Sequence, residues 1–174
     1  PPSNTGSVQN RGMPYGLPTE ITVGTPVELE DAINKLVDGD TIKLTANIDY
    51  NKGIVIDGIA MTFDVGQYKL NIANSDASGT GCGLEVKNSG TVTLLYTTGE
   101  LNASGHYYGV RAADSSTATV TNATATGANG YGAFAVDSSE ITILGDVEAV
   151  KIGSDGVVAW QSSSIRVIGN ATGS

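Results

Sequence analysis

The sequence predicts an all-β fold, a β-solenoid in which the chain winds through successive coils, with an amphipathic helix that covers the first coil. Three observations support this prediction. A turn motif recurs at a nearly constant spacing, short alternations of apolar and polar residues flank each copy, and a helix with capping signals precedes the first strands. A fixed period in this range is typical of stacked units that share one core.

The recurring motif is a polar residue followed by serine or glycine. Its copies lie 26, 23 and 24 residues apart. A leucine-rich repeat would need leucines at fixed spacing, whereas these units are rich in Thr, Ser, Val, Ile, Ala and Gly with a period of two residues. Each unit is therefore predicted as strand, turn and strand. The copies are Asn88-Ser89-Gly90, Asp114-Ser115-Ser116, Asp137-Ser138-Ser139 and Gln161-Ser162-Ser163.

Alignment of the four copies predicts which side chains face the core, because alternate residues of a strand point to opposite faces. The opposite register would bury charged residues such as Glu85 and Arg111, at a cost of several kcal/mol each. All sixteen residues of the predicted inward columns are apolar. The columns are Leu84, Val110, Ala133, Val157; Val86, Ala112, Ala135, Ala159; Val92, Ala118, Ile141, Ile165; and Leu94, Val120, Ile143, Val167.

A capping helix is predicted over about residues 26–38. Thr25-Pro26-Val27-Glu28 is a capping box with proline at the first helical position, and Gly39 ends the helix. Its apolar residues lie on one stripe. We expect this stripe to cover the open apolar end of the first coil and to protect an edge strand. The stripe consists of Leu29, Ala32, Ile33 and Leu36.

Two regions are predicted along the chain. Residues 1–20 form an extended N-terminal arm, with Met13, Tyr15 and Leu17 as apolar anchors. Residues 21–174 form the β-helix domain, in which strands between residues 41 and 72 have a looser register and regular coils start at about residue 83.

The start of this domain resembles a known family. Leu29-Glu30-Asp31-Ala32-Ile33, followed by Asp38-Gly39-Asp40-Thr41-Ile42-Lys43-Leu44, is similar to the start of right-handed parallel β-helices of the pectate-lyase-like superfamily. In that family a capping helix leads through a Gly-Asp-Thr-Ile turn into the first strand. The resemblance covers roughly residues 20 to 174 and implies a right-handed parallel β-helix. Lyases, hydrolases, phage tailspikes, adhesins and stalks share this fold, so the resemblance does not select a function.

Composition narrows the function classes. The chain has 18 acidic and 9 basic residues and a net charge of −9, which disfavours binding to nucleic acid or to an anionic membrane through a basic patch. No apolar run approaches the roughly 18 residues of a membrane span. Richness in Thr, Ser, Asn and Gly is typical of a secreted, cell-surface protein.

Catalytic and metal-binding signals are weak. His106 is the single histidine, and no nucleophile elbow accompanies it. Asp114 and Asp137 lie one coil apart, about 4.8 Å along the stack, and are weak candidates for a metal or catalytic site. Turn residues that hydrogen-bond the backbone explain them as well. We therefore predict no catalytic residue, no cofactor and no metal centre.

Two surface features point to partners. Phe134, Val136, Val158 and Trp160 fall on outward columns and are predicted to form an apolar patch, which indicates an interface or a glycan-binding surface. The chain's own arm is a further candidate to cover this patch. Asn102, Asn122 and Asn170 begin Asn-Ala-Ser/Thr sequons and are possible glycosylation sites.

The leading functional hypothesis is a non-enzymatic extracellular structural protein. Such a β-helix subunit or stalk segment would associate with copies of itself, head to tail or through its arm, into a surface assembly or filament. A carbohydrate-binding or adhesin module is the alternative, with a polysaccharide as partner. A polysaccharide lyase or hydrolase is less favoured, because no outer face of the predicted coils gathers both carboxylates and a base.

Overall fold

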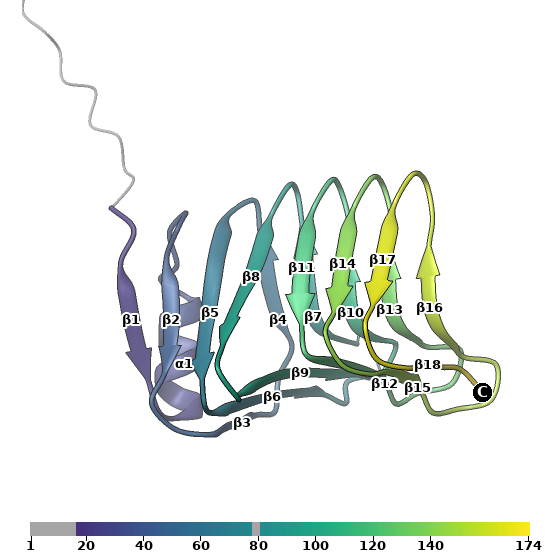
Figure 1. Cartoon of the computed structure of the whole chain (residues 1–174), viewed down its shortest axis with the longest axis horizontal. Helices are drawn as coiled ribbons and strands as arrows, with labels where there is room; N and C mark the ends of the chain where they lie inside the picture. The colour runs from purple at the N-terminus through teal and green to yellow at the C-terminus, as the bar shows by residue number, and fades with distance from the viewer. Residues whose placement is uncertain (1–16, 78–80) are drawn as a thin grey trace, which may run out of the picture.

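The computed structural model describes residues 17–77 and 81–174. Within them the chain makes about six turns of a β-solenoid whose sheets are all parallel. Three sheets wrap around one apolar core, and coil follows coil along the long axis (Figure 1). The prediction of an all-β parallel solenoid with an N-terminal capping helix is confirmed.

The largest sheet, sheet A, has seven strands and contains the strand after each recurring turn. Its outward residues in the middle strands are mostly threonines, which suit half-buried pleated surfaces. The strands in spatial order are β1 (Glu20–Val23), β2 (Thr41–Leu44), β5 (Ala60–Gly66), β8 (Thr91–Tyr96), β11 (Thr117–Val120), β14 (Glu140–Ile143) and β17 (Ser164–Val167).

The strands before the recurring turns form sheet C, which has five members. Its register matches the predicted columns: Leu84, Val110, Ala133 and Val157 are aligned partners in successive strands. The strands are β4 (Ile54–Asp57), β7 (Cys82–Lys87), β10 (Tyr108–Ala112), β13 (Tyr131–Ala135) and β16 (Asp155–Ala159).

Each coil also has a third strand, so the predicted unit of strand, turn and strand was incomplete. These strands make the six-stranded sheet B, which closes the cross-section. In the later coils these strands are short and their inward residues are mainly alanines, such as Ala123, Ala125 and Ala149, so the pattern was weak in the sequence. The strands are β3 (Ile48–Tyr50), β6 (Lys69–Asn74), β9 (Glu100–Gly105), β12 (Asn122–Ala125), β15 (Val147–Ala149) and β18 (Ala171–Thr172).

The regular register starts earlier than the predicted residue 83. Ile54 is aligned with Leu84 and Ile56 with Val86, so β4 already belongs to the apolar columns. The spacing between these aligned residues is 30 residues, longer than the later period, because the chain between β6 and β7 contains an additional segment. That longer interval hid the first coils from an alignment based on a constant spacing.

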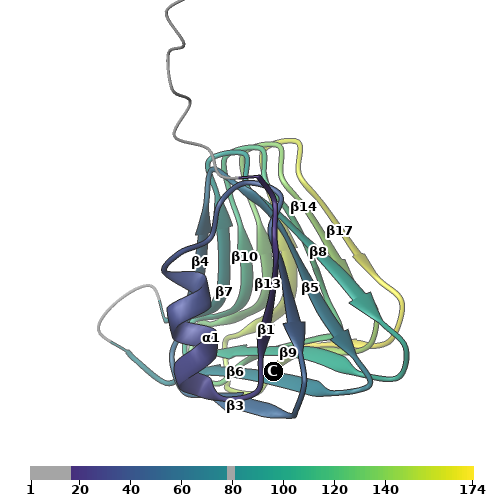
Figure 2. The same ribbon diagram turned by 90° about the vertical axis from the view of Figure 1, so that its left-hand side faces the viewer.

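The helix α1 (Pro26–Ile33) covers the first coil, as Figure 2 shows. Thr25 Oγ1 accepts a hydrogen bond from Glu28 N, and the Glu28 carboxylate accepts one from Gly24 N, so the capping box forms. Leu29 and Ala32 are buried. The helix ends at residue 33 and not at the predicted 38, because the amides of Lys35 and Leu36 bond to the third preceding carbonyl and tighten the chain into a turn.

The recurring turn has two consecutive left-handed residues in every coil where it occurs. Asp114 and Ser115, for example, have φ of 57° and 61°. The second of these residues donates its amide to a carbonyl of the next coil, as Ser115 N does to Asp137 O at 2.8 Å. The following serine also contributes, since Ser116 N donates to Ser139 Oγ. The serine pair is therefore a structural element that ties neighbouring coils together.

Asp40 organises the turn that leads from the helix into the first coil. Its side chain is 1% exposed and accepts hydrogen bonds from Thr19 N, Thr19 Oγ1 and Val37 N. Burial alone would raise the pKa of Asp40, but these three hydrogen bonds outweigh burial and lower the pKa below its usual value. The carboxylate is thus bound in its charged form, which explains the aspartate in the Gly-Asp-Thr-Ile turn.

This geometry predicts an acid-sensitive contribution to stability. A carboxyl whose pKa is lowered in the folded state stabilises the fold above its unfolded pKa of about 3.9, and this stabilisation is lost as pH falls through the lower folded pKa. We expect Asp40→Asn to destabilise the protein at pH 7 by roughly 1–3 kcal/mol. The difference in the free energy of unfolding between Asp40→Asn and wild type should shrink below about pH 3.9. Urea unfolding at a series of pH values measures this difference.

Asp31→Asn is the matched control, because Asp31 is exposed and forms a surface ion pair with Lys35. Its stability should follow that of wild type within about 0.5 kcal/mol at each pH. A deficit of Asp40→Asn that stays constant from pH 7 to pH 2 would contradict the assignment.

Candidate functional site

Four rings form an aromatic cluster on the outer face of sheet C: Tyr108, Tyr131, Phe134 and Trp160. Tyr108 and Tyr131 stack with centroids 5.7 Å apart, and Phe134 lies 5.4 Å and 5.2 Å from them. Trp160 meets Phe134 edge-on at 5.6 Å. The cluster spans β10, β13 and the residue that follows β16.

Glycine positions place the two tyrosines on this face. A Cβ on Gly109 would lie 2.5 Å from Gly132 O and from Thr124 N, so the backbone approaches β12 too closely for a side chain. Tyr108 and Tyr131 were not among the residues predicted for this surface. The signal that could have found them is the Tyr-Gly dipeptide, which opens two successive units one period apart.

The residues predicted to form the apolar patch lie close together, but two of the four are buried. Phe134 and Val136 are each only 8% exposed and pack with Ala113. Trp160 is 58% exposed. Burial raises the pKa of the Tyr108 hydroxyl. Each of the two stacked tyrosine rings covers one face of the other. The exposed aromatic surface of this cluster is therefore mainly the indole of Trp160.

Charged residues lie on the same outer face of sheet C nearer the helix. The Arg111 guanidinium pairs with the Glu85 carboxylate, and Lys87 Nζ lies 3.4 Å from Asp57 Oδ2. These carboxylates are matched by bases across neighbouring coils, as expected for cross-strand pairs that stabilise a sheet. The face therefore changes from ion pairs near α1 to aromatic rings near the opposite end.

We call the opposite end of the stack the C-terminal face and define it by Val157, Ala159, Ile165 and Val167. These residues continue the inward columns, yet Val157 is 38% exposed, while its aligned partner Ala133 is fully buried. β16, β17 and β18 each have a hydrogen-bonded neighbour on one side within the described structure, and they form one edge of the stack (Figure 1).

Exposed apolar side chains concentrate around this C-terminal face. Ten large hydrophobic residues are exposed in the described part of the chain, and five of them lie between residues 150 and 168. Such a concentration distinguishes an interaction surface from the scattered apolar residues of an ordinary surface. The five are Val150, Ile152, Val157, Trp160 and Ile168.

A polar ladder on sheet B accounts for the three sequon asparagines. Asn71 Nδ2 donates to Asp49 Oδ1 at 2.7 Å, Asn102 Nδ2 to Asn71 Oδ1 at 2.9 Å, and Asn122 Nδ2 to Asn102 Oδ1 at 2.8 Å. Asp146 and Asn170 continue the same column, with Asn170 Nδ2 donating to Asp146 Oδ1. The nitrogen that would carry a glycan is thus engaged in the ladder at all three sequons.

Asp114 and Asp137 occupy the same turn position in successive coils. Both have left-handed backbones, with φ of 57° and 55°. The side-chain hydrogen bonds of the described residues do not include either carboxylate, so the expected bond to a nearby amide is not formed there. No group of three His, Cys, Asp or Glu residues suited to a metal ion occurs within residues 17–77 and 81–174.

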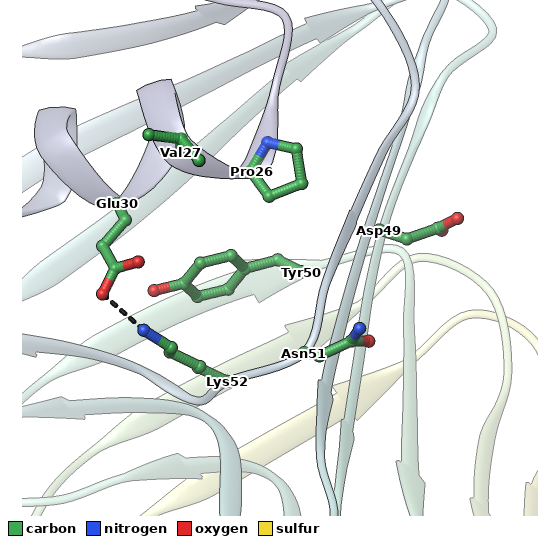
Figure 3. Close-up of a pocket in the computed structure, with 7 residues that line it drawn as sticks. All are labelled: Pro26, Val27, Glu30, Asp49, Tyr50, Asn51 and Lys52. Carbon is green, nitrogen blue, oxygen red and sulfur yellow. Dashed lines mark hydrogen bonds and ion pairs between the residues drawn. The ribbon is translucent and has the colours of Figure 1, made fainter.

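A hollow of about 220 Å³ lies between α1 and β3 (Figure 3). Lys52 Nζ donates to Glu30 Oε1 at 2.6 Å across it, and Asp49 takes part in the polar ladder. Burial, then the nearby Glu30 charge, raise the pKa of Tyr50. The hollow is smaller than typical ligand pockets of about 300–1,000 Å³. Lys52 pairs with Glu30, and Asp49 accepts a hydrogen bond from Asn71, so the polar groups that line the hollow bind other side chains of the protein.

The remaining observations do not single out a catalytic centre. His106 contacts Tyr107 edge-on, with ring centroids 4.6 Å apart. In the part of the chain that the structure describes, no helix is long and apolar enough to cross a membrane. Comparison with protein-family models, with curated proteins and with solved structures gives no match.

The polar ladder generates a stability prediction. Asn102→Ala removes the acceptor of Asn122 Nδ2 and the donor to Asn71 Oδ1, leaving two partly buried groups unpaired. We expect a loss of about 1–3 kcal/mol in the free energy of unfolding, measured by urea denaturation. Ser104→Ala, two residues along the same strand, is the control and should change stability by less than about 0.5 kcal/mol. Equal losses for the two variants would argue against the ladder.

Proposed function

We propose that this chain is a non-enzymatic structural protein of the extracellular surface, with a β-helix of the pectate-lyase-like class, that adds β-structure from another subunit at its C-terminal face. One observation carries the proposal. The inward apolar columns run into the last coil, where Val157, Ala159, Ile165 and Val167 are covered on one side only.

Hydrogen-bonding groups at this face favour a β-strand as the occupant. The outer edges of β16, β17 and β18 present backbone amides and carbonyls, which is the arrangement that recruits additional strands. Ser139 N donates to Ser163 Oγ, so the serine ladder also reaches the last coil. A strand in register would extend both the backbone hydrogen bonds and the apolar columns.

The extracellular location and the arm remain supported by sequence alone. Richness in Thr, Ser, Asn and Gly supports a secreted surface protein. The arm anchors Met13 and Tyr15 lie outside the described residues, whereas Leu17 is 85% exposed. Contacts between subunits through the arm stay a prediction.

A charge at the C-terminal face tests the proposal. Val157→Asp should weaken self-association at least about tenfold, because association would desolvate the new carboxylate. Since Val157 is already 38% exposed, the fold should lose less than about 2 kcal/mol. Analytical ultracentrifugation measures association, and circular dichroism measures the retained β-structure.

Val55→Asp is the matched control, because Val55 is a 48% exposed valine in β4, at the other end of sheet C. It should associate as wild type does. A wild-type protein that is monomeric at high concentration would exclude self-assembly through this face.

Carbohydrate binding is the second candidate, and the exposed Trp160 beside the aromatic cluster favours it. An open indole is suited to stacking on a sugar ring. Electrophoresis in gels containing neutral or acidic polysaccharides should then show retardation that Trp160→Ala abolishes. Leu95→Ala, which alters a 52% exposed residue on sheet A, should leave the retardation unchanged. Wild-type mobility unaffected by every polysaccharide would eliminate this candidate.

A polysaccharide lyase or hydrolase has less support. The carboxylates of Glu85 and Asp57 on sheet C are paired with Arg111 and Lys87. A two-carboxylate mechanism needs an acid and a base free to face substrate.

A further inference from the structure

The two ends of the solenoid differ in chemistry. At the helix end, Val23, Leu29 and Ala32 are buried, so α1 and β1 seal the apolar core. The outer surface of α1 carries the charged residues Glu30 and Asp31 beside one exposed apolar residue, Val27. At the other end the apolar columns open to solvent. An apolar C-terminal face is matched better by a second C-terminal face than by the charged surface of the helix.

Among the three strands at the C-terminal face, β16 is best suited to pair with its own copy. It has five residues, compared with four in β17 and two in β18. The central outward residue of β16 is Val158, whereas β17 presents Arg166, which would bring like charges close to a twofold axis. Like charges directly opposite each other destabilise paired strands.

The register of such a pair follows from the side-chain faces. Two copies related by a twofold axis pair antiparallel along the edge, and inward residues must oppose inward residues. With the axis at Val158, Val157 lies opposite Ala159 of the second copy, and both are inward. Trp160 then lies opposite Gly156, where no side chain blocks the indole. Aromatic residues across from edge glycines are a known means of fixing register.

We propose that two copies of this chain associate tail to tail through their C-terminal faces, with antiparallel pairing of β16 centred on Val158. This inference rests on the proposed function and specifies its partner: a second copy in a closed dimer. Pairing in this register covers Val157, Val158 and Trp160, which the single chain leaves partly or largely exposed. The interface is isologous, so association stops at two subunits.

A cysteine on the twofold axis provides a direct test. In the Val158→Cys variant, the two new thiols would lie opposite each other, and mild oxidation should yield a covalent dimer in high yield. The native Cys82 is 3% exposed, so the wild-type protein should give little cross-linking under the same conditions. Val55→Cys is the matched control: it lies in the same outward column at the far end of sheet C and should not cross-link.

The outcomes separate this inference from the proposed function. A mixture of the two variants could instead form disulfides between Val55→Cys and Val158→Cys chains, or the wild type could form an open series of oligomers. Either result would indicate head-to-tail contact, which overturns tail-to-tail pairing but retains assembly at the C-terminal face. A wild-type protein that stays monomeric, without cross-links in any variant, would overturn both.

A second measurement uses the native chain, so that it does not depend on the folding of a variant. Trp160 is the single tryptophan and is 58% exposed in one copy. Its emission should shift to shorter wavelength over the same concentration range in which the mass doubles in sedimentation. Mass doubling with an unchanged emission maximum would place the contact elsewhere and contradict the pairing of β16.

Discussion

The structure depends on the stacking of each coil in register on the one before it. Parallel strands exchange hydrogen bonds only with the coils on either side, and the side chains of one column occupy the same position in every turn. The columns are apolar throughout but vary in size: Ile42, Phe63 and Leu94 are aligned in sheet A, whereas Val110 is followed by Ala133 in sheet C.

Polar groups obey the same constraint and stabilise the stack through side chains. The ladder runs from Asp49 through Asn71, Asn102 and Asn122. Each asparagine side chain donates a hydrogen bond to the side-chain oxygen of the preceding coil. The serine hydroxyls at the recurring turn accept hydrogen bonds from backbone amides of the preceding coil. In the later coils both ladders add polar attachments to the backbone hydrogen bonds. The sequon asparagines, which resemble modification sites in the sequence, thus serve the stacking itself.

The fold could be predicted from the sequence because inward columns such as Val110 and Ile143 must all be apolar at a constant spacing. The start of the helix was predictable from Thr25 and Glu28, whereas its end was not, because tightening after Ile33 depends on packing against the first coil. In the coils after residue 83, the strands of sheet B were missed since most of their inward residues are alanines, such as Ala103, Ala123 and Ala149. Its sequence signal was present in the repeated Asn-Ala pairs of the sequons, which mark one column of the polar ladder. Tyr108 and Tyr131 were missed because the backbone departs from strict alternation at the following glycines.

The helix that seals one end also gives the stack a direction. In a quasi-one-dimensional protein each coil is stabilised by its neighbours, so an end coil with one neighbour opens more readily than an interior coil. α1 supplies the missing contacts to the first coil through Leu29 and Ala32, whereas no helix among the described residues covers β16, β17 and β18. In a single copy, the coil formed by β16, β17 and β18 therefore unfolds locally at a lower temperature than the coil under the helix. Local unfolding advances from that coil toward α1.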